Sequence, residues 1–289
     1  MKLKLRAAAK LNLTLDVTAK REDGYHELKS IMQAVSLFET IIIEENISGI
    51  ITITCDLPGV PCDKSNIAAK CAAAYYEAAG IQNKGLHIDI QKHIPMQAGL
   101  AGGSADGAAV LYGLNHIYKK FNDQELVTLA ASIGADIPFC LMGGTALAEG
   151  IGEKLTPLEF IPECTFVIIK PDIGISTAQA YGAVDKFGMN SSPSTDVMLR
   201  LMSSAEKIAS FLHNDFEAAL NIPQIYEACS KLNKCSGCLG AQMTGSGSAV
   251  FGIFENENDA KIAEERLFKE YPFVKAVKPC KFGVEITKA

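Results

Sequence analysis

The segment PMQAGLAGGSADGAAVLYGLNHIYKK, residues 95–120, decides the fold because its character changes along its length. It follows LHIDIQKHI (86–94), in which apolar and polar residues alternate as in a half-buried strand. Closely spaced glycines then indicate a loop, and the Ala-rich remainder has the composition of an amphipathic helix. This order favours phosphate binding, because glycines let the backbone approach a ligand and the start of a helix offers unpaired N–H groups.

The loop lacks both common nucleotide-binding signatures. A Walker A loop requires GxxxxGK[ST], and Ala101 interrupts the GxGxxG fingerprint of dinucleotide-binding folds. By composition alone, two interpretations stay open. The loop either binds phosphate, or it is a tight turn between strand and helix whose glycines serve packing only.

Strand and helix signals alternate along the rest of the chain, which favours a mixed α+β fold. LNLTLDV (11–17) has apolar residues at every second position, and β-rich runs at 41–43 and 50–54 suggest a meander. Ser65 is the expected cap of a helix that ends before Gly80. The later strand-like segments are 146–158 (two strands around a turn), 165–171, 248–254 and 273–277, and the later helix-like segments are 122–133, 176–187, 195–212 and 215–233.

Composition describes an ordinary folded protein of 289 residues, with 48% hydrophobic and 21% charged residues. The 27 Lys and Arg are outnumbered by 33 Asp and Glu, and the net charge of -6 argues against nucleic acid as the main partner. The chain has no apolar run of membrane-spanning length, and MKLKLRAAAKLNL lacks the apolar core of a secretory signal. We therefore expect a cytoplasmic protein that spans no membrane.

The nine cysteines are odd in number and scattered, which indicates a reducing compartment. Cys235 and Cys238 have CxxC spacing, with Cys229 close by. A zinc site needs about four ligands, and no second pair stands at a matching distance. The favoured interpretation is a Gly-containing turn with incidental thiols, and a metal or redox role is the alternative.

Four stretches together resemble a known family. PMQAGLAGGSADGAA (95–109) resembles the second motif of the galactokinase, homoserine kinase, mevalonate kinase and phosphomevalonate kinase (GHMP) superfamily. AAAKLNLTLDVTAKREDGYHEL (7–28) is similar to its first motif, and GAQMTGSGSAVFGIF (240–254) to its third. GADIPF (134–139) is a further match. Within the superfamily, AKLNLTL followed by KREDGYHEL is similar to the members that act on a cytidine diphosphate-linked methylerythritol.

The resemblance implies a two-domain α+β fold. Residues 1–158 would form a ribosomal-protein-S5-like α/β half that binds ATP, and residues 159–289 a ferredoxin-like α+β half. It also implies an ATP-dependent kinase that phosphorylates the 2-hydroxyl of this acceptor, a step of non-mevalonate isoprenoid synthesis. A monomer and a homodimer both fit this expectation.

In the resemblance, the phosphates of ATP lie along the Gly-rich loop. The residues implied to bind the nucleotide are Pro95, Met96, Gln97, Ala98, Gly99, Leu100, Ala101, Gly102, Gly103 and Ser104. Ala101 replaces a Gly and Ala105 replaces a Ser that are common in the family, so Ser104 alone supplies a hydroxyl there. No carboxylate stands clearly where some relatives hold Mg²⁺, and we assign no metal ligand in the chain. Mg²⁺ is expected to be carried mainly by the ATP phosphates and water.

The resemblance implies two catalytic residues, Lys10 and Asp136. Lys10 would supply a cation that lowers the pKa of the acceptor or steadies the transferring group. Asp136, which the Gly- and Pro-rich GADIPF places in a loop, would accept the proton, and an ion pair with Lys10 would keep it ionised. Without the resemblance, the two would be a lysine at a strand end and a turn aspartate.

The acceptor site is implied by an aromatic group and several polar positions. Tyr25 and Tyr181 suit the two faces of cytosine, and the imidazole of His26 suits its polar edge. All three could instead be packing residues. The remaining residues implied to bind the acceptor are Asn12, Thr177 and Gly245.

Three other functions compete with this one. The first is a GHMP-type kinase for mevalonate, homoserine or a sugar, and the DGYH sequence argues against it because those acceptors have no base to stack. The second is a relative that binds nucleotide and has lost catalysis, against which stand the intact Lys10 and Asp136. The third, a nucleic-acid-binding domain, is disfavoured by the charge balance.

Overall fold

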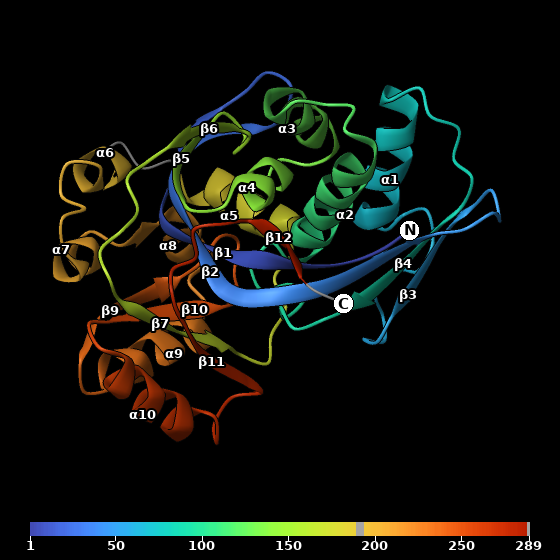
Figure 1. Ribbon diagram of the computed structural model, residues 1–289. Helices are drawn as coiled ribbons and strands as arrows, with labels where there is room; N and C mark the ends of the chain where they lie inside the picture. The colour runs from blue at the N-terminus through green and yellow to red at the C-terminus, as the bar shows by residue number, and fades with distance from the viewer. Residues whose placement is uncertain (189–193, 288–289) are drawn as a thin grey trace.

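The computed structural model describes residues 1–188 and 194–287, and the strands of these residues form two sheets (Figure 1). Two long antiparallel neighbours, β1 (Lys2–Lys20) and β2 (His26–Glu45), form the base of the first sheet. The other strands of this sheet are β3 (Ile51–Cys55), β4 (Leu86–Gln91), β5 (Thr145–Glu149), β6 (Lys154–Pro157), β8 (His213–Asn214) and β12 (Val284–Thr287). The main order is β12-β1-β2-β4-β3; β5 pairs with β2 and with β6, and β8 runs parallel to β1.

The second sheet is a smaller antiparallel one in the order β11-β7-β10-β9. Its strands are β7 (Thr165–Lys170), β9 (Cys238–Met243), β10 (Val250–Phe254) and β11 (Phe273–Val277). This sheet lies beside the first one, with α9 (Pro223–Asn233) and α10 (Glu257–Leu267) against its outer face (Figure 1).

The remaining helices belong to two groups. Four gather on one side of β1 and β2 (Figure 1), and these are α1 (Ile67–Ala78), α2 (Gly102–Tyr118), α3 (Asp123–Ile133) and α4 (Ile137–Met142). The others follow β7 in the chain, and these are α5 (Thr177–Phe187), α6 (Ser194–Met198), α7 (Ala205–Ser210) and α8 (Asp215–Leu220).

Many of the elements predicted from the sequence are confirmed. The alternating run 11–17 lies within β1, and the Gly-rich loop joins β4 to α2 as predicted. Asn122 caps α3 in a capping box with Glu125, because its side chain accepts from the Glu125 amide and the Glu125 carboxylate accepts from the Asn122 amide. The two-strand hairpin at 146–158 and the strands at 165–171, 248–254 and 273–277 are also present.

Other predictions were wrong in identifiable ways. Asn66, not Ser65, caps α1, because the Ser65 hydroxyl donates to Asp63 instead. The suggested meander does not form, since β4 lies between β2 and β3 and pairs with β3 in parallel. The apolar face of β4 (Leu86, Ile88 and Ile90) is completely buried, which favours this internal position.

Two long predicted helices are each divided into two. The stretch 195–212 contains α6 and α7, and 215–233 contains α8 and α9, because Pro223 begins a new helix and has no N–H to continue the preceding one. Only residues 41–43 of β2 were predicted as strand, and neither β9 nor α10 was predicted.

β7 explains how the second sheet is held. It has a continuous apolar run because both of its faces are buried. Phe166 and Ile168 face the large core shared with the first sheet, and Val167 and Ile169 face the core under α9 and α10. The two sheets therefore share one apolar layer.

The proposed division after residue 158 falls between β6 and β7, where the chain passes from the first sheet to the second. Two later strands, β8 and β12, pair with β1 in the first sheet, so the chain returns there after that point. The division itself stays a prediction. Within the described residues, no helix combines the length and the apolar character that a membrane crossing requires.

Phe166→Ala should strongly destabilise the protein, because Phe166 is fully buried and its ring lies 5.7 Å from that of Phe251 in an edge-on contact. The free energy of unfolding, measured by urea denaturation, should fall by about 3–5 kcal/mol. Phe268→Ala is the matched control, because Phe268 is 65% exposed, and it should change stability by no more than about 0.5 kcal/mol. Equal losses in both variants would contradict the shared core.

Candidate active site

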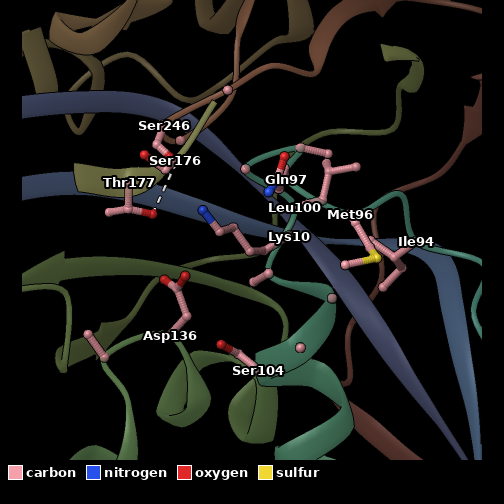
Figure 2. Close-up of a pocket in the computed structure, with 18 of the residues that line it drawn as sticks. Lys10, Ile94, Met96, Gln97, Leu100, Ser104, Asp136, Ser176, Thr177 and Ser246 are labelled. Atoms are coloured by element: carbon pink, nitrogen blue, oxygen red, sulfur yellow. Dashed lines mark hydrogen bonds between the residues drawn. The ribbon is translucent and has the colours of Figure 1, made fainter. Parts of the chain in front are cut away.

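A cavity of about 720 Å³ opens where the Gly-rich loop, the start of α2 and the first turn of α5 meet (Figure 2). All ten residues expected to bind the nucleotide line it, from Pro95 to Ser104. Lys10 and Asp136 also line it, as do five of the six residues expected to bind the acceptor, namely Asn12, Tyr25, Thr177, Tyr181 and Gly245. The sequence motifs, which are separated by up to about two hundred residues, are thus brought to one site.

The Gly-rich loop has the backbone shape that a close ligand requires. Gly99 has a φ of +72°, and a Cβ atom there would overlap the Thr244 carbonyl oxygen. Ala101 also adopts a left-handed φ of 60°, although it carries a Cβ atom. In the described chain no side chain caps α2, so its first N–H groups at Gly102, Gly103 and Ser104 border the cavity. Such a helix start favours an anion.

Lys10 is held by its own strand. It is 4% exposed, and its ammonium group donates to Asn12 Oδ1 at 2.6 Å. The two side chains meet because residues two apart lie on the same face of a strand. Asn12 Nδ2 in turn donates to Ser30 Oγ at 2.8 Å, which fixes the amide.

Asp136 precedes α4 and points its carboxylate toward Lys10 across the cavity (Figure 2). The predicted loop position is confirmed, because Asp136 lies in the turn 134–136 between α3 and α4, where it is also the N-cap residue of α4. Within the described chain its side chain makes no capping hydrogen bond. The expected ion pair between Lys10 and Asp136 was wrong, because no salt bridge joins these two described residues and the Lys10 ammonium donates to Asn12 Oδ1 instead.

The aromatic residues form one end of the cavity. Tyr25 is 60% exposed, and Tyr181 is packed edge-on against Phe216, with their ring centroids 4.9 Å apart. Burial, and secondly the negative charge of Asp136, raise the pKa of Tyr181 to about 12, so its hydroxyl stays protonated at neutral pH. The two tyrosines line this side of the cavity with aromatic side chains.

His26 does not line the cavity, unlike the other residues expected to bind the acceptor. Its ring is stacked on Tyr181 at 4.8 Å, and its Nε2 lies 2.8 Å from Asp185 Oδ1. Asp185 also accepts from Lys20 Nζ at 2.7 Å. Asp185 was not found from the sequence, because it belongs to no motif and only the fold brings it to β2.

Gly245 and Thr177 close the cavity from the side of the second sheet. Gly245 has a φ of +54°, and a Cβ atom there would lie 2.9 Å from the Gly99 carbonyl oxygen and 3.1 Å from Lys10 Nζ, so a side chain would crowd this approach. Thr177 Oγ1 lies 3.5 Å from Ser246 Oγ, and the dashed line in Figure 2 marks this contact.

A buried charged group that the sequence analysis missed supports the Gly-rich loop. Lys92 Nζ lies 2.5 Å from Glu39 Oε1 and 2.8 Å from Asp106 Oδ2, and all three side chains are at most 5% exposed. Lys92 and Asp106 also line the cavity. This ion-pair group ties β2, the end of β4 and the first turns of α2 together. Glu39 and Lys92 lie outside the motifs, and Asp106 lies in the motif 95–109, where it was given no role. No spacing in the sequence therefore reveals this group.

Comparisons with known proteins agree with this geometry. The family described as GHMP kinases N terminal domain matches residues 66–144, and the family described as GHMP kinases C terminal matches residues 197–272. A 4-diphosphocytidyl-2-C-methyl-D-erythritol kinase of Caldicellulosiruptor saccharolyticus is 44% identical over 91% of this chain and 92% of its own. The chain belongs to the 4-diphosphocytidyl-2-C-methyl-D-erythritol kinase family of GHMP kinases. The kinase of this name from Alkaliphilus oremlandii is 41% identical, and 98% of each chain is covered.

Solved structures extend the comparison to the fold of this family. A crystal structure of a 4-(cytidine 5'-diphospho)-2C-methyl-D-erythritol kinase matches with a TM-score of 0.81 and 34% identity, and it covers 96% of this chain and 98% of that one. A homoserine kinase from Cytophaga hutchinsonii matches with a TM-score of 0.77 at 19% identity, covering 99% and 97%, and shows the fold alone. The two-domain α+β GHMP kinase fold predicted from the sequence is confirmed.

The free energy of unfolding should depend less on pH in the Asp106→Asn variant than in the wild type. Burial raises the pKa of Asp106 to about 7; Lys92 opposes this shift, and the Glu39 carboxylate adds to it. An unfolded Asp has a pKa of about 3.9, so between these values the folded state binds more protons than the unfolded state. The free energy of unfolding of the wild type should therefore fall as the pH rises from about 4 to about 7.

Urea denaturation at several pH values across this window measures the effect. The variant should lose much of the fall that the wild type shows. Asp123→Asn, at an exposed position on α3, is the matched control and should keep the wild-type pH profile. A variant at position 106 with the wild-type profile would show that Asp106 is already ionised throughout this range.

Proposed function

We propose that this chain transfers the γ-phosphoryl group of ATP to the 2-hydroxyl of 4-diphosphocytidyl-2-C-methyl-D-erythritol. Such a reaction is a step of non-mevalonate isoprenoid precursor synthesis. One observation carries the proposal: Lys10 and Asp136 face one cavity that has an uncapped helix start on one side and two tyrosines on the other. Membership of the 4-diphosphocytidyl-2-C-methyl-D-erythritol kinase family supports the identity of the acceptor.

The Gly-rich loop and the start of α2 hold the phosphates. The N–H groups of Gly102, Gly103 and Ser104 and the Ser104 hydroxyl are donors at this end of the cavity. Lys10 adds a positive charge that its hydrogen-bond partner, the neutral side chain of Asn12, does not offset. Phosphoryl transfer depends mainly on such positioning and charge stabilisation.

Asp136 acts as the general base. It accepts the proton of the acceptor hydroxyl as the hydroxyl oxygen forms its bond to the γ-phosphorus, and the bond between this phosphorus and the β-phosphate oxygen breaks to leave ADP. Asp136 is available for this step because its carboxylate neither caps α4 nor pairs with Lys10 in the described chain. Lys10 steadies the negative charge on the transferring group.

The donor set limits how a divalent cation could be bound. Among the described residues, Asp106 and Asp136 are the two carboxylates that line the cavity, and Asp106 is already paired with Lys92. The residues present therefore fit Mg²⁺ that is carried mainly by the ATP phosphates and water. Mg²⁺ would neutralise phosphate charge there.

The two ends of the cavity suit two different nucleotides. Tyr25 and Tyr181 provide aromatic faces for the cytosine of the acceptor. On the other side of the Gly-rich loop, Pro61, Asn66 and the loop start at Pro95 leave room for the adenosine of ATP. A cytoplasmic location and a monomeric or dimeric state remain predictions from the sequence.

The release of ADP by the purified protein with Mg²⁺ and ATP tests the proposal. Turnover is expected with 4-diphosphocytidyl-2-C-methyl-D-erythritol and not with mevalonate, homoserine or galactose. Asp136→Asn should lower kcat by about 10²–10⁴-fold while ATP binding stays near normal, because the variant loses only the base. Retained turnover would remove Asp136 from this role. Turnover with another acceptor would keep the kinase and discard the cytosine pocket, and no turnover would favour an inactive nucleotide-binding relative.

Tyr25→Ala should chiefly weaken acceptor binding. Loss of one stacking face should raise the KM for the acceptor by about tenfold, which corresponds to about 1.4 kcal/mol, with a smaller change in kcat. Steady-state kinetics with the acceptor varied at saturating ATP measure this. Tyr226→Ala, at an exposed tyrosine of α9 outside the cavity, is the control. An acceptor KM that is unchanged in Tyr25→Ala would exclude the stacking role.

A further inference from the structure

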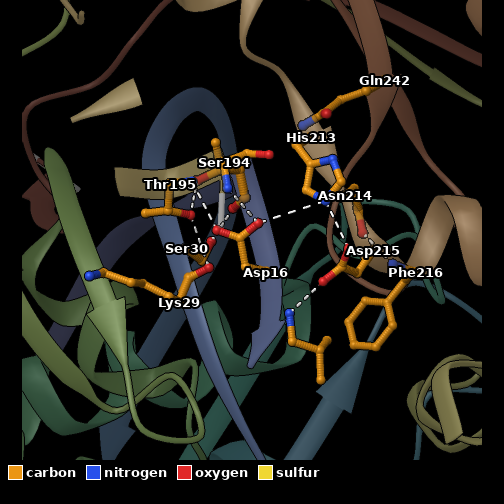
Figure 3. A network of polar contacts seen from close by, with 12 residues as sticks. Asp16, Lys29, Ser30, Ser194, Thr195, His213, Asn214, Asp215, Phe216 and Gln242 are labelled. Carbon is orange, nitrogen blue, oxygen red and sulfur yellow. Dashed lines mark hydrogen bonds and ion pairs between the residues drawn. The ribbon is translucent and has the colours of Figure 1, made fainter. Parts of the chain in front are cut away.

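The segment His213–Glu217 pairs with β1 on one side, bonds to the loop 243–247 on the other, and belongs to none of the sequence motifs. Figure 3 shows His213, Asn214 and Asp215 of this segment near Asp16 of β1. β8 pairs its first two residues in parallel with β1, and Asp215 Oδ2 accepts from the Val17 amide at 2.7 Å. On the same side, His213 Nε2 lies 2.8 Å from Asp215 Oδ1. The segment is therefore fixed to the strand that carries Lys10 and Asn12.

Both polar atoms of the Asn214 side chain form hydrogen bonds with the backbone. Its Nδ2 donates to the Met243 and Gly245 carbonyl oxygens, each at 2.9 Å, and its Oδ1 accepts from the Phe216 amide at 2.9 Å. The residue is 5% exposed, so water cannot replace these bonds. Among uncharged side chains, only Asn and Gln offer two N–H donors and an oxygen acceptor together.

The loop that Asn214 holds reaches the catalytic residues directly. A Cβ atom on Gly245 would lie 3.1 Å from Lys10 Nζ and 3.2 Å from Asn12 Oδ1, so the backbone of this loop passes close to both groups. Thr244 Oγ1 accepts from the Asn12 amide at 2.9 Å, and Glu217 Oε2 accepts from the Met243 amide at 2.6 Å. A shift of the loop would therefore move the groups that orient the Lys10 ammonium.

We propose that Asn214 is a positioning residue for phosphoryl transfer, which sets the loop 243–247 against Lys10 and Asn12 by holding the carbonyl groups of Met243 and Gly245. The inference rests on the proposed kinase activity. Asn214 does not touch the reacting groups, because it lies behind the loop and does not line the cavity. Its effect passes through Gly245 to the Lys10–Asn12 pair.

The positioning role is separable from the role of Asn214 as the cap of α8. Asn214→Asp keeps the side-chain oxygen that caps the helix, since Asp is as good a cap as Asn, but it removes both N–H donors. Asn214→Ser likewise keeps a capping oxygen and adds no buried charge, so it covers the case in which the aspartate variant fails to fold. Asn122→Asp, at the exposed cap of α3, is the matched control.

The first readout is kinetic. In the ADP-release assay, Asn214→Asp and Asn214→Ser should lower kcat by about 10- to 100-fold, because a small misplacement of a catalytic group has effects of this size. The KM for ATP should change by a smaller factor than kcat, since Asn214 makes no contact with the start of α2, although the loop that it holds bonds to Gln97 and Ala98. Asn122→Asp should match the wild type in both constants. A wild-type kcat in folded Asn214 variants would overturn the proposal.

The second readout does not require activity. Hydrogen exchange, followed by mass spectrometry on the peptide that covers residues 243–249, reports on the loop, because the Ser248 and Ala249 amides donate to the Gln97 and Ala98 carbonyls. Exchange should be faster in both Asn214 variants and unchanged in Asn122→Asp. Unchanged exchange in the Asn214 variants would overturn the positioning role, whether or not the wild type is active. Absence of turnover in the wild type would instead reject the proposed function.

Discussion

The contact between two glycine-containing loops is the constraint on which the site depends. The Ser248 amide donates to the Gln97 carbonyl at 3.2 Å, and the Ala249 amide to the Ala98 carbonyl at 3.1 Å. The first loop follows β4 of the first sheet, and the second leads into β10 of the second sheet. These backbone bonds fix the Gly-rich loop relative to the second sheet. Gly99 makes the approach possible, because a side chain there would overlap the Thr244 carbonyl oxygen.

The electrostatics of the cavity follow from how its two lysines are paired. Lys92 lies between two buried carboxylates, so its charge is neutralised within the protein. Lys10 is equally buried, but its near partner is the neutral amide of Asn12. Its positive charge therefore remains available to a phosphate. Lysine therefore has a structural role at position 92, and its neutral partner at position 10 leaves it suited to the proposed chemistry.

The sequence predicted correctly those elements whose formation depends on local patterns of residues. Alternation predicted β1 and β4, and the glycines between 99 and 103 predicted the loop that joins β4 to α2. It was less informative where packing decides. The meander failed because β4, which lies forty residues after β2, buries its apolar face between β2 and β3. No local periodicity contains that long-range choice.

For the site, the sequence by itself determined which residue types were present and in which motifs, and it placed Lys10, Asp136 and the loop 95–104 in one family pattern. Only the tertiary structure decided what each side chain contacts. It paired Lys10 with Asn12 rather than Asp136, turned His26 toward Asp185, and brought Asn214 behind Gly245. The physical reason is that hydrogen bonds form between the nearest complementary groups, and nearness between distant segments is set by the folded backbone rather than by spacing along the chain.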